Sequence, residues 1–145
     1  MKPLTYTAIN YFHDWVSKNI LIGDNFEIAL EILGENNYTH IAEMTFTNIR
    51  NLEFIYWTFD EDQKKLNKYS ELKNWDLITT YAKDRWLQSA KQNEGMTEIE
   101  FIGGNEDQES FVVLFNFKYD NLKIKVNGKI FENEEDLGLY LRENK

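Results

Sequence analysis

The chain has 145 residues, of which 42% are hydrophobic and 15% aromatic, and 16 Lys and Arg stand against 25 Asp and Glu for a formal net charge of −9. This length fits one domain, and the apolar content excludes a disordered chain. The absence of cysteine excludes disulfides and thiolate metal sites. The negative charge disfavours direct nucleic-acid binding and favours a basic partner, although it equally serves solubility.

Neither a membrane span nor a secretion signal is evident in the sequence. No segment approaches the roughly 20 apolar residues that a spanning helix needs. The first residues lack the apolar core of a signal peptide. We therefore expect a single globular domain over residues 1–145, located in the cytoplasm.

The first third of the chain predicts one short helix followed by strands. Ile9, Phe12 and Val16 recur at helical spacing and predict a helix over residues 8–19. Residues 26–33 alternate between apolar and more polar side chains, which is the period of a strand, although their Glu, Ala and Leu also favour a helix.

Two further strands are expected over residues 39–47 and 52–59, which are rich in β-branched and aromatic residues. Residues 34–37 form the turn before the first of them. Both faces of the second strand are apolar, so it is expected to lie in the centre of the sheet.

The middle of the chain predicts two helices. Residues 61–72 are rich in lysine, and Asp60, Glu61 and Asp62 stand at their start, where carboxylates suit the positive end of a helix dipole. Residues 75–92 carry an apolar stripe at steps of three or four. The stripe consists of Trp75, Ile78, Ala82, Trp86 and Ala90.

The last third predicts a meander of strands that ends in a helix. Strands are expected over residues 96–102, 111–119, 122–126 and 129–131. Asn127-Gly128 is a strong hairpin signal, since both residues tolerate positive φ. Asn133 is expected to cap a final helix whose first turn holds Glu134, Glu135 and Asp136. The predicted fold class is therefore α+β, with an antiparallel sheet of about five to seven strands packed by two or three helices.

The sequence shows no pattern typical of catalysis. His13 and His40 are the only histidines and have no partner at metal-ligand spacing. Gly103-Gly104 lies between two predicted strands rather than before a helix, so it does not predict a phosphate site. Glu98 and Glu100 could form an acid–base pair on one strand face, but a solvated strand face explains them more simply. We expect no enzyme activity, no cofactor and no metal.

Aromatic side chains next to carboxylates indicate a protein-binding surface. Aromatic anchors beside acidic groups are typical of an interface for a basic partner, although burial, helix capping and loop solvation explain the same residues. The candidate binding residues for such a partner are Trp57, Phe59, Asp60, Glu61, Asp62, Glu106, Asp107 and Glu109.

The stretch from about residue 74 to 143 resembles immunity proteins of bacterial contact-dependent growth inhibition systems. The resemblance rests on the segments 74–77, 85–89 and 110–119, on the strand 122–126 with its Asn-Gly turn, and on the C-terminal helix. It is a packing pattern without catalytic residues, and it covers about half the chain. It implies a small cytoplasmic protein that binds the C-terminal domain of a cognate secreted toxin, often a nuclease.

The predicted function is neutralisation of a toxin, expected to be a basic nuclease, by direct protein association. Carboxylates can imitate the phosphates that such a nuclease holds. Two alternatives remain open at this stage. One is a small α+β ligand-binding protein or enzyme with an aromatic-lined pocket and Glu98 as acid or base. The other is a self-associating accessory protein.

Overall fold

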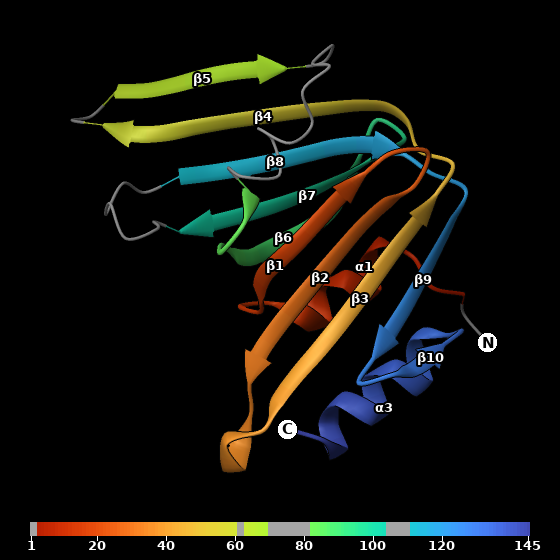
Figure 1. Cartoon of the computed structure of the whole chain (residues 1–145). Coiled ribbons are helices and arrows are strands. Elements are labelled where there is room, and N and C mark those ends of the chain that lie inside the picture. Colours follow the sequence, from red (N-terminus) through yellow and green to blue (C-terminus); the bar gives the residue numbers. More distant parts are fainter. Residues whose placement is uncertain (1–2, 61–62, 70–81, 104–110) are drawn as a thin grey trace.

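The computed structural model describes residues 3–60, 63–69, 82–103 and 111–145, and of residues 56–60, 63–69 and 111 it describes the backbone alone. Its strands form one antiparallel sheet of ten strands in the order β10-β9-β3-β2-β1-β6-β7-β8-β4-β5 (Figure 1). The strands are β1 (Val16–Ile22), β2 (Phe26–Leu33), β3 (Thr39–Thr47), β4 (Arg50–Asp60), β5 (Gln63–Tyr69), β6 (Trp86–Asn93), β7 (Met96–Gly103), β8 (Phe111–Lys118), β9 (Asn121–Val126) and β10 (Lys129–Phe131).

The sheet is folded into two halves of five strands. One half runs from β10 to β1 and the other from β6 to β5, and the only register pair that joins β1 to β6 is Val16 with Trp86. The chain turns the corner between the halves twice, where β3 continues into β4 and β8 into β9 (Figure 1). Each half therefore consists of segments that are distant in sequence.

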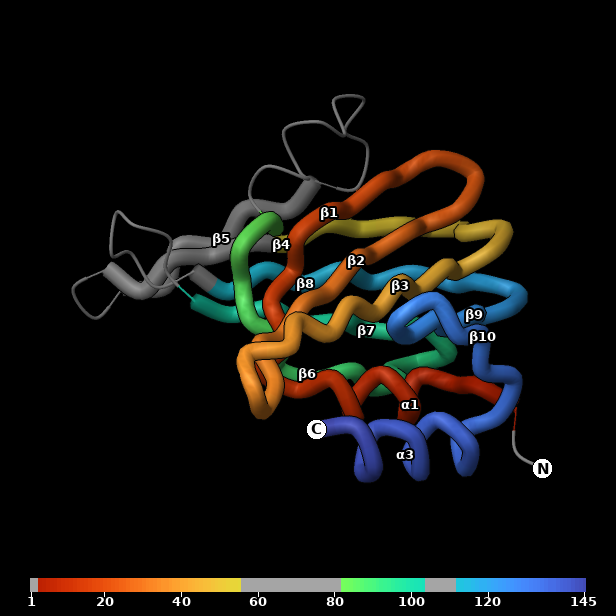
Figure 2. Tube along the Cα trace, turned by 60° about the horizontal axis from the view of Figure 1, so that its bottom comes forward, coloured from red at the N-terminus to blue at the C-terminus, as the bar shows by residue number. Residues whose placement is uncertain are grey.

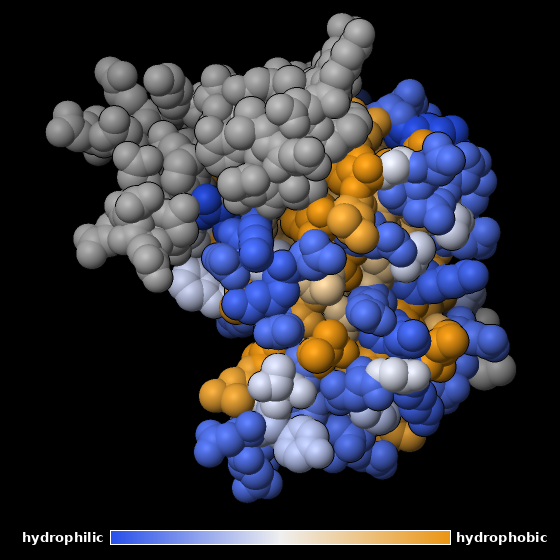
Figure 3. Space-filling view, in the orientation of Figure 1, coloured by the Kyte–Doolittle hydropathy of each residue, from blue (hydrophilic) through white to orange (hydrophobic). Residues whose placement is uncertain are grey.

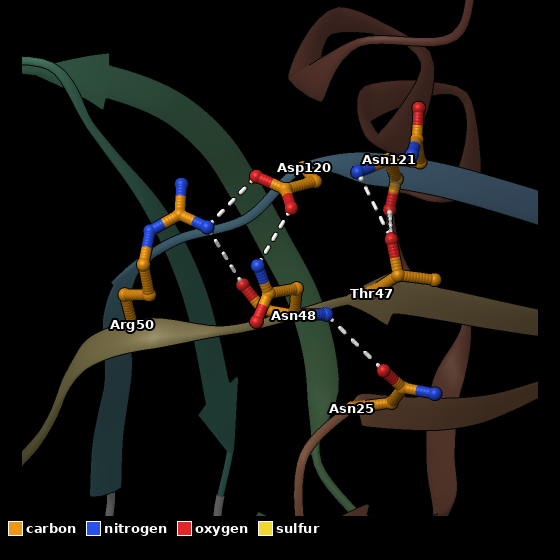
Figure 4. Close-up of polar contacts among 6 residues, drawn as sticks. All are labelled: Asn25, Thr47, Asn48, Arg50, Asp120 and Asn121. Atoms are coloured by element: carbon orange, nitrogen blue, oxygen red, sulfur yellow. Dashed lines mark hydrogen bonds and ion pairs between the residues drawn. The ribbon is translucent and has the colours of Figure 1, made fainter.

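A polar network holds this corner together (Figure 4). Arg50 Nη1 lies 2.7 Å from Asp120 Oδ1, and the side-chain amide of Asn48 donates to the other oxygen of Asp120 at 2.7 Å. The backbone N–H of Asn48 donates to Asn25 Oδ1 at 3.1 Å. Asn48 has φ 52°, in the left-handed region that asparagine enters more readily than most residues. Two chain crossings and the β1–β2 turn are thereby tied to one point.

The core between the two halves is aromatic. Phe26 of β2 stacks on Phe117 of β8 with ring centroids 5.2 Å apart, and it meets Phe115 edge to face at 4.9 Å. Phe46 of β3 contacts Phe117 at 5.0 Å. All four rings are fully buried. Alternation along β2, β3 and β8 places one side-chain set of each strand in this layer, so the two halves pack face to face.

Helices cover one side of this core. They are α1 (Tyr6–Ile9), the 3₁₀ turn η1 (Asn10–Phe12) and α3 (Glu134–Glu143). A second 3₁₀ turn, η2 (Glu35–Asn37), connects β2 to β3 and buries no residue. Figure 2 shows α1 and α3 next to each other below the sheet. Ile9, Phe12 and Leu137 are fully buried in the core, and Thr7 of α1 donates a hydrogen bond to Glu134 of α3 at 2.8 Å.

The expected α+β class is wrong, because the described chain is mainly one antiparallel sheet with short helices. The sheet has ten strands rather than five to seven. The difference arises in segments with helical spacing of apolar residues that instead pair as strands. The predicted domain organisation, one domain over residues 1–145, remains a prediction.

The helix predicted over residues 8–19 ends early. Helical structure stops at Phe12, and β1 begins at Val16. Asp14 has φ 70°, a conformation that no α-helix continues through. The β-branched Val16, Ile20 and Ile22 that follow favour the extended backbone.

The two helices predicted in the middle of the chain are also wrong over most of the residues that the structure describes, although Ala82 of the second is helical. Residues 63–69 of the first form β5, which pairs with β4. Residues 86–92 of the second belong to β6, and Asp84 with φ 60° separates them from the residues before. Trp86, which belongs to the apolar stripe of the predicted helix, is 46% exposed. Residues 61–62 and 70–81 lie outside the described part.

The remaining elements agree with the sequence. The strand over residues 26–33 is confirmed as β2, and those over 39–47 and 52–59 as β3 and most of β4. The Asn127-Gly128 turn is confirmed, with φ of 51° and 85°. Asn133 caps α3, since its Oδ1 accepts from the backbone N–H of Asp136 at 2.8 Å.

Candidate functional site

The face of strands β1, β2, β3, β9 and β10 that points away from the aromatic core carries the candidate site, and we call it the outer face. Period-2 alternation places every second side chain of these strands on it. Its members are Asn19, Leu21, Glu27, Ala29, Glu31, Leu33, Ile41, Glu43, Thr45, Lys123, Lys125 and Ile130. In Figure 3 this face is turned toward the viewer, with apolar side chains among hydrophilic ones.

Large apolar side chains stand exposed on the outer face. Leu33 is 65% exposed, Ile130 64%, Leu21 53% and Ile41 41%. These four are half of the exposed large hydrophobic residues among those the structure describes. Isolated exposed apolar residues are ordinary, but a group of them on one sheet face is typical of a surface that another molecule covers.

The charges on the outer face are separated by strand. The carboxylates of Glu27 and Glu31 lie on β2 and that of Glu43 on β3, while Lys123 and Lys125 lie on β9. The register aligns Glu43 with Lys125, and their charged groups are 3.9 Å apart on the exposed surface. Such an exposed pair contributes little to stability. The face therefore has an acidic side toward β2 and a basic side toward β9.

A groove runs across the outer face where the side chains are short. Its volume is about 360 Å³, and Ala29 and Thr45 form part of its floor. Leu21 of β1 and Ile130 of β10 line it from the two opposite edges of this half of the sheet, and Glu27 stands beside it. The groove has the size of a small binding pocket and combines apolar and charged walls.

The structure does not describe the side chains that the sequence analysis selected. The backbone of Trp57, Phe59 and Asp60 belongs to β4, and the register aligns Trp57 with Val112 of β8. The remaining five residues lie outside the described residues, and they are Glu61, Asp62, Glu106, Asp107 and Glu109. Their role in binding stays a prediction.

The carboxylates weighed as an acid–base pair lie away from the outer face. Glu98 and Glu100 are half-buried on β7. Glu98 lies 3.7 Å from the ammonium of Lys91 and accepts a hydrogen bond from Asn93 at 3.2 Å. Among the described residues, no group of three or more His, Asp and Glu is arranged to hold a metal ion. The arrangement of Glu98 is that of a structural ion pair.

Sequence reasoning missed the exposed apolar residues of the outer face. Leu33 follows Glu27, Ala29 and Glu31 at strand spacing, so its place on the polar side of β2 could be read from the alternation. Ile130 follows the Asn-Gly turn in a strand of three residues. The exposed surface could have been predicted from large apolar residues that fall on the same side of a strand as its polar residues.

Fold and site together define a folded antiparallel β-sheet protein with an exposed, charge-divided sheet face. Comparison with protein-family models, with curated proteins and with solved structures gave no match. No helix among the described residues has both the length and the apolar character needed to cross a bilayer.

Proposed function

We propose that this protein is a cytoplasmic immunity protein that binds a secreted toxin domain and neutralises it by direct association. The observation that supports this function best is the grouping of Leu33, Ile41 and Ile130 on a sheet face that also carries Glu27 and Glu43. Protein interfaces combine an apolar centre with a polar rim, and the outer face offers both. The toxin is expected to be a basic nuclease, in keeping with the charge of −9.

The charge separation gives the association a defined orientation. Basic groups of the toxin would face Glu27 and Glu43, and acidic groups would face Lys123 and Lys125. Complementary charges raise the association rate more than the final affinity, so binding should weaken as salt increases. The inhibitor needs no catalytic group of its own for this function.

The test is calorimetric titration of the protein with the toxin domain encoded next to its gene, at low and at high salt. We expect a 1:1 complex whose affinity decreases with salt. Absence of binding at low salt would contradict the proposal. Sedimentation of the protein alone identifies the competing case, in which the outer face joins two copies of this chain.

A matched pair of charge reversals locates the interface. Glu27→Lys on the outer face and Glu94→Lys in the β6–β7 turn change the net charge equally, and both glutamates are exposed. If the outer face is the interface, Glu27→Lys lowers affinity by tenfold or more, as expected when a charge pair of about 1.5 kcal/mol is lost, and Glu94→Lys has a small effect. Equal effects would show that only overall charge matters.

A further inference from the structure

A second site lies at the end of the sheet where β2 turns into β3. An apolar hollow of about 460 Å³ is lined there by Trp15, Ile32 and Leu141, with Tyr11 and His40 also at its wall. Leu33 of the outer face also lines it, but its lining shares no residue with the groove of the outer face. Its size and apolar walls fit a small organic molecule.

The hydrogen bonds around His40 assign its tautomer. Asn127 Oδ1 accepts from the backbone N–H of Ile41 at 3.0 Å, so its Nδ2 is the side that faces His40. Nδ2 is 2.9 Å from His40 Nδ1 and can only donate, which makes Nδ1 the acceptor. The ring hydrogen of His40 therefore lies on Nε2.

This Nε2–H is a buried donor without an acceptor. His40 is 9% exposed, and among the described residues no hydrogen-bond partner reaches Nε2. Gly34 shields it closely, since a Cβ added to Gly34 would lie 2.6 Å from Nε2. A buried donor left unpaired costs about 1–3 kcal/mol, so an acceptor supplied from the hollow would be stabilising.

The turn that shields Nε2 is easy to displace. It consists of η2, which has no buried residue, and its Asn36 and Asn37 both have φ 60°. Gly34 is held to it by a hydrogen bond to the carbonyl of Tyr38 at 2.7 Å. Segments with few buried contacts open at low free-energy cost, so an acceptor in the hollow can reach Nε2 when this turn moves outward.

We propose that the hollow binds a compact apolar molecule that carries one neutral hydrogen-bond acceptor, such as a ketone or ester carbonyl. The apolar body contacts Trp15, Ile32 and Leu141, and the carbonyl oxygen accepts from Nε2–H of His40. A carboxylate is the poorer ligand, because burial of its charge beside the buried ring of His40 is costly, and the two charged side chains that line the hollow, Glu35 and Lys145, are of opposite sign. This proposal does not depend on the function proposed for the outer face.

Three probes of similar shape test the proposal by NMR titration. Acetophenone has the carbonyl, ethylbenzene lacks it and benzoate is charged. The protein has two histidines, so the imidazole signals of His40 report on the hollow while those of His13 serve as an internal control. We expect acetophenone to bind about five- to tenfold more tightly than ethylbenzene, since one hydrogen bond is added, and benzoate to bind weakest.

Variants separate the hydrogen bond from the apolar contact. In His40→Phe, where the indole signals of Trp15 in the wall of the hollow report binding, the affinities for acetophenone and ethylbenzene should become equal. His13→Phe should leave their ratio unchanged. Gly34→Ala, which places a methyl group against Nε2, should also remove the preference for acetophenone, and it serves if His40→Phe does not fold. No shift of the His40 signals with any probe, or an unchanged ratio in both variants, would overturn the proposal.

Discussion

Asn10 and Ala90 are joined by two hydrogen bonds that imitate a strand pair. The side-chain Nδ2 of Asn10 donates to the carbonyl of Ala90 at 2.9 Å, and the backbone N–H of Ala90 donates to Asn10 Oδ1 at 2.8 Å. Ala90 lies on β6, which pairs with β1 only at Trp86. His13 Nδ1 is also 2.9 Å from the carbonyl of Gln88. Side chains from the α1–η1 segment thus satisfy backbone groups on the edge of β6 opposite β7, where β1 no longer pairs with it.

Replacement of Asn10 should destabilise the protein more than replacement of an ordinary polar surface residue does. Asn10→Ala leaves the N–H and carbonyl of Ala90 without these partners, which should lower the free energy of unfolding by about 1–3 kcal/mol. Urea unfolding measures the change. Gln92→Ala, an exposed polar residue two positions along the same strand, is the control and should stay within about 0.5 kcal/mol of wild type. Equal effects of the two variants would show that the Asn10 bonds contribute nothing.

The stacked pair Phe26 and Phe117 makes another quantitative prediction. Phe26→Ala removes a fully buried ring that contacts both halves of the sheet, so it should cost about 3–5 kcal/mol of unfolding free energy. Tyr38→Ala provides the contrast, because Tyr38 is 73% exposed and its loss should change stability by less than about 1 kcal/mol. A small effect of Phe26→Ala would mean that the two halves do not depend on this aromatic layer.

The sequence predicted the regular hairpins of this fold better than its folded sheet. Alternation identified β2, β3, β7, β8 and β9, and Asn127-Gly128 identified the last turn, because these signals are local. The helical spacing of Ala82, Trp86 and Ala90 led to the wrong prediction of a helix over β6. A bulge between Leu87 and Ser89 shifts the alternation of this strand by one residue, so its strand pattern is hidden. The pairing of β3 with β9 and of β4 with β8 depends on the corner, and no local pattern encodes it.

Asp120 makes the corner sensitive to acid. Hydrogen bonds from Asn48 and then Arg50 hold the pKa of Asp120 below its ordinary value of 3.8. A carboxyl group with a lower pKa in the folded state stabilises that state above its unfolded pKa, and the contribution disappears as pH falls through the folded pKa. The stability difference between wild type and Asp120→Asn should therefore shrink as the pH falls below 3.8. Unfolding curves of both proteins at a series of acidic pH values measure it, and a constant difference would contradict the assignment.

Tyr119 should act at the opposite end of the pH scale. Burial raises the pKa of its hydroxyl above the ordinary 10.0, and a hydrogen bond with Thr97 opposes that effect in part. The contribution of a group whose pKa is raised by folding is complete below the unfolded pKa and is lost as pH rises through the folded one. Wild type should therefore lose stability relative to Tyr119→Phe above pH 10.0. If the free energies of unfolding of the two proteins differ by the same amount at every alkaline pH, folding does not change the pKa of the Tyr119 hydroxyl.

The candidate site was less accessible to sequence reasoning than the strands. Trp57 and Asp60 were selected because aromatic and acidic residues adjoin in the sequence, whereas the outer face collects its residues from β1, β2, β3, β9 and β10. Ile41 and Ile130 belong to strands separated by more than eighty residues in the chain, and only the sheet order brings them onto one face. Strand order is a non-local property, so a surface of this kind cannot be assembled from local patterns.

Asn127 offers a direct check on the tautomer of His40. In Asn127→Asp the carboxylate can still accept from the N–H of Ile41, but the atom that faced His40 Nδ1 as a donor becomes an acceptor. The ring should respond by carrying a hydrogen on Nδ1, because two acceptors cannot share a hydrogen bond. The ¹⁵N chemical shifts of the imidazole distinguish the two nitrogens. Asn127→Gly, which keeps the positive φ of the turn and removes the side chain, separates this effect from backbone strain. If wild type already shows the hydrogen on Nδ1, the hydrogen-bond directions assigned to Asn127 are wrong and the buried donor at Nε2 does not exist.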